Sequence, residues 1–73
     1  MQNEEVAVKQ VEKIEFIDEA TGGRIAMTVY SREDLMILID IALPERPATA
    51  VSLPPDIAKR FAEAIVRAIS ASA

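Results

Sequence analysis

The sequence predicts an α+β fold in which a four-stranded antiparallel β-meander is followed by one C-terminal α-helix packed on a face of the sheet. Three observations lead to this prediction. Several segments before residue 54 alternate apolar and polar residues, the pattern of half-buried strands. Glycine or proline pairs interrupt these segments, as expected of turns. The last third of the chain repeats its apolar residues at the helical period.

The 73 residues are expected to form one small domain, residues 1–73, because single domains commonly contain about 100–150 residues. Residues 1–5 are acidic and polar, and we expect them to be frayed. The N-terminus lacks the basic and apolar regions of a signal peptide. The longest apolar run, Leu35–Ile39, is far shorter than the roughly 20 residues that cross a bilayer. These features predict a cytoplasmic protein.

The first two strands form a predicted hairpin. Alternation is clearest over residues 11–17, whereas residues 6–12 alternate loosely and also fit a helical turn. Residues 18–23 end in two glycines, which supply the positive φ that tight hairpin connections need. Residues 24–31 form the second arm, with Ile25, Met27 and Val29 on one face.

The third element allows two interpretations. Alternate positions of residues 35–43 carry leucine or isoleucine, and β-branched side chains favour a strand. The alternative is a helix capped by Ser31, with Asp34 three residues later as in a capping box.

Prolines mark the remaining boundaries. Pro44 and Pro47 end the third element, and residues 50–53 form a short fourth strand. Proline is tolerated at the first helical position, so a helix is expected from Pro55 to about Ser70.

The predicted helix is apolar over an arc of about 200°, roughly twice the stripe that a surface helix needs. The third strand also carries Met36, Leu38 and Ala42 on its second face. A chain this small buries only about 60% of its unfolded surface on folding. Contiguous apolar patches that stay exposed usually mark an interface. We therefore predict a homodimer, the alternative being a monomer whose N-terminal arm covers the stripe. The predicted interface residues are Ala58, Phe61, Ala62, Ile65, Val66, Ile69, Met36 and Leu38.

The residue types argue against catalysis. With no cysteine and no histidine, the chain lacks a thiol nucleophile, an imidazole base and the usual zinc ligands. Asp40 is the one carboxylate within an apolar run. It either pairs with Arg24, Arg32 or Arg46 or is a charge that prevents aggregation through the strands of separate molecules. We expect no enzyme, no cofactor and no metal site.

Charge is unevenly distributed. The chain has 8 basic and 12 acidic residues, giving a net charge of −4. Residues 1–45 carry ten acids and four bases, whereas residues 46–73 carry two acids and four bases. An apolar surface with an acidic rim predicts a non-enzymatic protein–protein interaction module, serving as an accessory subunit or as an inhibitor of a larger protein.

The second half of the chain resembles the PC4 family of transcriptional coactivators. The resemblance lies in residues 37–41, the proline-bearing loop, residues 51–54 and the amphipathic helix. It implies a module of four strands and a helix that binds single-stranded DNA as a dimer. The resemblance also implies a sheet that is basic and carries aromatic residues, whereas aromatic residues make up only 4% of this chain. Weak single-stranded nucleic-acid binding is therefore the alternative function.

Overall fold

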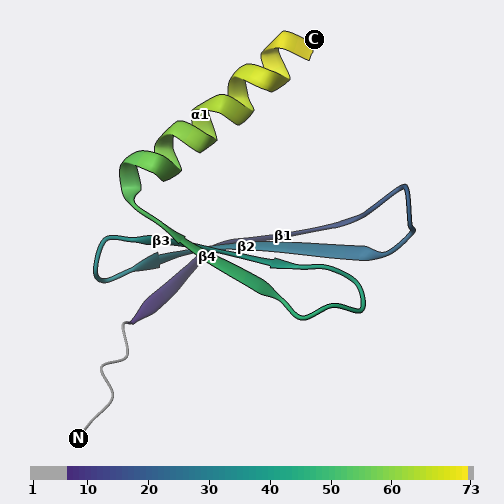
Figure 1. Ribbon diagram of the computed structural model, residues 1–73, viewed down its shortest axis with the longest axis horizontal. Helices are drawn as coiled ribbons and strands as arrows, with labels where there is room; N and C mark the ends of the chain where they lie inside the picture. Colours follow the sequence, from purple (N-terminus) through teal and green to yellow (C-terminus); the bar gives the residue numbers. More distant parts are fainter. Residues whose placement is uncertain (1–6, 73) are drawn as a thin grey trace, which may run out of the picture.

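The computed structural model describes residues 7–72, and the predicted frayed segment, residues 1–5, lies outside this range. Four strands form one antiparallel sheet in the order β1-β2-β3-β4, and one helix follows them (Figure 1). The predicted α+β meander is confirmed. The elements are β1 (Val8–Ile17), β2 (Arg24–Arg32), β3 (Ile37–Ala42), β4 (Thr49–Leu53) and α1 (Pro55–Ser72).

Strand β1 contains a bulge near its start. Its register with β2 shifts between Gln10 and Glu12, so the residues before the shift have the opposite parity from those after it. The strand nevertheless begins at Val8, and the helical-turn interpretation is wrong for the described part of residues 6–12. Val8 and Ile14 therefore lie on opposite faces of the sheet, although both occupy even positions in the sequence.

The β2–β3 connection rules out the capped-helix interpretation. Arg32 and Met36 bracket a tight hairpin turn, in which the Arg32 amide donates to the Met36 carbonyl at 3.1 Å. Asp34 does accept a backbone hydrogen bond, but from the Met36 amide at 3.2 Å within the turn. Leu35 takes a φ of 72°, so the third strand starts two residues later than predicted. Asp34 therefore serves turn chemistry rather than helix capping.

The β1–β2 hairpin has the predicted glycine connection. Gly22 has a φ of 76°, a conformation that glycine adopts without a Cβ clash. Its amide donates to the Asp18 carbonyl at 2.7 Å, and the Thr21 hydroxyl donates to the Asp18 carboxylate at 2.9 Å. Gly23 fits for a different reason, because an added Cβ would collide with the ring of Pro44 in the β3–β4 connection.

The sheet has two chemically different faces. Pairing places Ile14, Met27 and Ile41 side by side across three strands, and Val29, Ile39 and Val51 side by side across the neighbouring row. We call this side the apolar face. Residues of the other parity form the polar face, which includes Lys13, Glu15, Thr28, Tyr30, Arg32, Leu38, Asp40 and Ser52.

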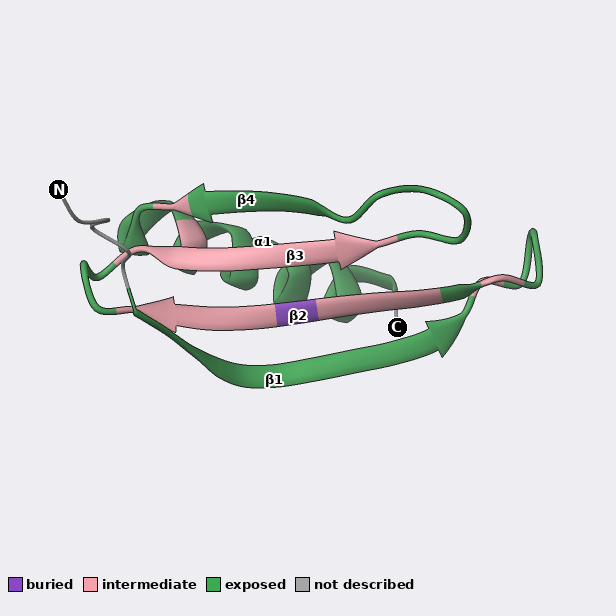
Figure 2. Cartoon of the chain, turned by 90° about the horizontal axis from the view of Figure 1, so that it is seen from below, coloured by how far each residue is buried: buried purple, intermediate pink, exposed green. Residues whose placement is uncertain are grey.

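Helix α1 follows β4 directly and diverges from the sheet along its length (Figure 1). Ala58 is half-buried, whereas the other described helix residues are exposed. Burial is concentrated in the two central strands, β2 and β3 (Figure 2). The predicted helix is therefore present, but it leaves most of the apolar face uncovered.

The described chain has no closed hydrophobic core. Thr28, with 6% of its surface exposed, is the one buried residue in the range 7–72, and it belongs to the polar face. The molecule exposes 6019 Å², against about 4,500 Å² for a compact monomer of 8.0 kDa. A single copy is thus more open than its mass requires.

The packing of the two loops against each other gives the first prediction. Gly23→Ala places a Cβ 3.0 Å from the Pro44 Cβ and closer still to the Pro44 Cγ. We expect it to lower the free energy of unfolding by about 1–3 kcal/mol, the usual cost of overpacking. Pro44→Ala removes the ring, so the double variant should recover part of this loss. Urea denaturation of the four chains measures the coupling, and strictly additive losses would contradict the contact.

Candidate functional site

The strongest candidate for a functional site is the open space between helix and sheet, which we call the wedge. One side is the apolar face of the sheet and the other is the inner side of α1. Its lining is apolar except for one lysine. The lining residues are Ile14, Met27, Val29, Ile37, Ile39, Pro55, Ala58, Lys59, Phe61, Ala62 and Ile65.

The closed end of the wedge is fixed by the start of α1. Leu53 ends β4, and Pro54 and Pro55 turn the chain into the helix within two residues. The Ala58 amide donates to the Pro54 carbonyl at 3.0 Å, which forms the first helical turn. Asp56 lies in that turn, where the positive end of the helix dipole favours a carboxylate. The proline pair thus fixes where the helix leaves the sheet, and the wedge opens from there.

Half of the predicted interface residues line the wedge. Ala58, Phe61, Ala62 and Ile65 face the apolar side of the sheet from one side of α1. Their spacing of three and four residues is the periodicity that predicted them. Phe61 is 56% exposed although it is the largest apolar side chain of the helix, so the sheet of its own chain does not cover it.

The other predicted residues lie elsewhere. Val66 and Ile69 belong to α1 outside the wedge lining and are 61% and 66% exposed. Leu38 pairs with Tyr30 and Ser52 on the polar face, away from the helix. Met36 precedes β3 in the hairpin turn. The structure therefore does not bring Leu38 together with the predicted helix residues.

Several lining residues were not among the predicted site residues. Ile14, Val29, Ile37 and Ile39 form the sheet side of the wedge. The sequence signal was present, because these residues share one parity within each strand. Alternation does not tell whether such a face is covered by its own helix, and only the divergence of α1 distinguishes an open surface from a covered one.

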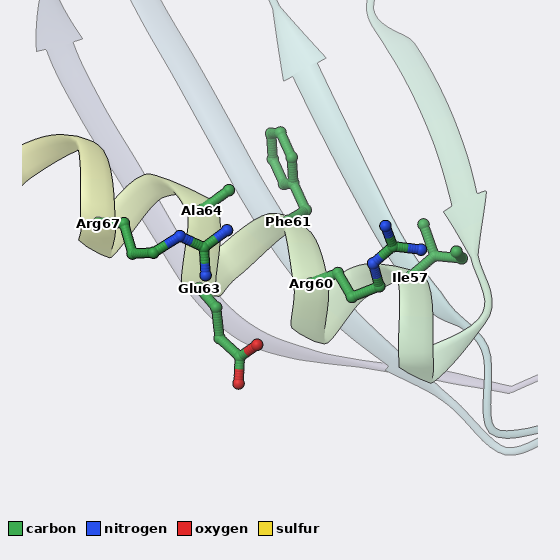
Figure 3. Close-up of a pocket in the computed structure, with 6 residues that line it drawn as sticks. All are labelled: Ile57, Arg60, Phe61, Glu63, Ala64 and Arg67. Atoms are coloured by element: carbon green, nitrogen blue, oxygen red, sulfur yellow. The ribbon is translucent and has the colours of Figure 1, made fainter.

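The outer side of α1 is charged. Arg60, Glu63 and Arg67 lie along this side, and Figure 3 shows Glu63 projecting away from Phe61 and Ala64. Glu63 precedes Arg67 by four residues, the favourable order for a charged pair on a helix surface. The helix thus presents its apolar residues to the wedge and beside it, and its charged residues to solvent.

The polar face carries paired charges. The Arg32 guanidinium donates to the Ser52 hydroxyl at 2.7 Å and to the Asp34 carboxylate at 2.8 Å. Lys13 lies 3.6 Å from the carboxylate of Glu15. These are the two ion pairs within residues 7–72, and neither includes Asp40, which lies opposite Thr28 and Ala50. Of the two interpretations of Asp40, pairing with an arginine is therefore not found in the described range.

Comparison of the chain with family models, curated proteins and solved structures finds no significant match. Within the described range, no helix has the length and apolar character needed to cross a membrane. The same range holds no group of three potential metal-ligating side chains.

The Arg32 contacts give the second prediction. Arg32→Met removes two hydrogen bonds that link β2 to β4 and to the hairpin turn, and we expect it to lower the free energy of unfolding by about 1–3 kcal/mol. Arg24→Met, at an exposed position of the same strand and face, should change it by less than about 0.5 kcal/mol. Urea denaturation compares the two variants, and equal losses would contradict the role of these bonds.

Proposed function

We propose that this chain is a non-enzymatic protein–protein interaction module that acts as a homodimer, serving as an accessory subunit or an inhibitor of a larger protein. The observation that carries the proposal is that no hydrophobic side chain in the range 7–72 is buried. Contiguous exposed apolar surface of this kind marks sites of association in soluble proteins.

The composition supports association as the way to stabilise the fold. A chain of 73 residues has a small core, and this one has no cysteine to add a disulfide. Closed point-group symmetry is the usual form of soluble homo-oligomers, with the two-fold dimer the commonest. A dimer that covers the wedge supplies the missing core.

The proposed accessory or inhibitory role uses the surfaces that such a dimer leaves free. Residues 7–53 carry eight acidic and five basic side chains, which suits a partner with a basic surface. The pairing of Lys13 and Arg32 with carboxylates lowers the cationic character of the polar face, so nucleic acid is the less favoured ligand. Affinity capture that returns no protein partner at low and at moderate salt would contradict this role.

The third prediction tests the homodimer. Sedimentation equilibrium of the unaltered chain should give twice the chain mass of 8.0 kDa. Ile69→Glu should shift the mass toward that of one copy. Ile69 is 66% exposed in a single chain, and a glutamate at this position would be a buried charge once a second copy covers α1. We expect the association constant to fall at least about 100-fold, since burying an unpaired charge costs several kcal/mol.

Ser70→Glu is the matched control. It adds the same charge one residue further along α1, on the polar arc of the helix, and should leave the mass unchanged. A mass of 8.0 kDa for the unaltered chain at high concentration would overturn the proposed homodimer.

A further inference from the structure

The exposed surface area of one copy indicates how much surface a partner would cover. One copy exposes about 1,500 Å² more than a compact monomer of its mass, 6019 Å² against about 4,500 Å². A standard interface buries about 800 Å² per partner, and obligate homodimers bury about 1,000–2,500 Å² per partner. An excess of this order fits the burial of a large apolar surface against a second copy.

The shape of the wedge indicates what fits inside it. A protein segment that fills the wedge needs two apolar surfaces, one that contacts the apolar face of the sheet and one that contacts α1. Helix α1 itself has this property, since Val66 and Ile69 extend its apolar arc beyond the residues that line its own wedge. Ala58 and Ala62 are small and allow a second helix to approach closely.

The wedge and a helix that fits it belong to the same chain, which is the condition for a self-complementary two-fold interface. If α1 of one copy packs against the sheet of a second copy, a two-fold axis places α1 of the second copy against the sheet of the first. One association then covers the apolar faces of both sheets and the apolar sides of both helices. Charge agrees with this arrangement, because Lys59 is the one charged residue of the wedge lining and Glu12, which pairs with Val29, lies on the apolar face.

We propose that the wedge is filled by a second copy of this chain, with α1 of each copy packed against the apolar face of the other copy's sheet and the two helices in contact. This inference rests on the proposed homodimer and adds its geometry. It assigns Ile14, Met27, Val29, Ile37 and Ile39 as the surface that receives the partner's helix.

Single-cysteine cross-linking tests the geometry, because the chain has no cysteine of its own. One copy carries Ile14→Cys in the apolar face, and a second, enlarged by a tag, carries Ile65→Cys in α1. These residues are 49% and 47% exposed in one chain, so neither change removes a buried side chain. The two chains are unfolded together in urea, refolded and treated with a short bis-maleimide. The tag separates mixed products from unmixed ones on a denaturing gel.

Lys13→Cys is the matched control, because Lys13 neighbours Ile14 on β1 and lies on the polar face. We expect Ile14→Cys with Ile65→Cys to give at least about tenfold more mixed product than Lys13→Cys with Ile65→Cys, since successive strand residues point to opposite faces. If Ile14→Cys does not refold, Val51→Cys and Ala50→Cys provide the same comparison on β4.

Two further outcomes separate this inference from the homodimer proposal. A dimeric mass with no excess of mixed product from the Ile14 position overturns the inference and leaves the homodimer standing, with its interface elsewhere. A monomeric mass of the untreated chains overturns both. Cross-linking confined to pairs of Ile65→Cys chains, at a dimeric mass, indicates helix–helix contact alone and also overturns the inference.

Discussion

The structure depends on one unmet requirement, which is the covering of the apolar face of the sheet. Strands of this meander carry isoleucine, valine and methionine on one side, and apolar surface left in water costs about 25 cal/mol per Å². The element that should cover them, α1, touches the sheet near Ala58 and then diverges. The most protected residue of the described chain, Thr28, lies on the opposite face.

Much of the fold follows from local sequence signals. The glycine pair at the β1–β2 turn, the proline pair before α1 and the alternation in β3 each predict the element that is found. Two features depend on signals that alternation does not carry. The bulge near Gln10 reverses the parity of β1, and the positive φ of Leu35 lets a non-glycine residue complete a hairpin turn. Asp34 fits a helix cap and a turn equally well in sequence, and only the pairing of β2 with β3 decides between them.

The candidate site was predictable in part for a related reason. Helical periodicity identifies Phe61 and Ile65 as one face of α1, but it does not say whether that face meets the sheet of its own chain or that of another. The placement of Leu38 on the polar face follows from alternation within β3, since Leu38 and Asp40 share a parity that the isoleucines of the strand do not. The angle at which α1 leaves the sheet is a tertiary property, and the wedge is its direct consequence.

The central claim is that the hydrophobic core is completed by a second copy. Urea unfolding at two protein concentrations tests it most directly, because dissociation is then part of unfolding. A tenfold rise in concentration changes the stability of a dimer by about 1.4 kcal/mol and should move the urea midpoint upward by roughly 0.5 M. A midpoint that stays constant across concentrations would contradict the account, since a single copy would then hold its own core.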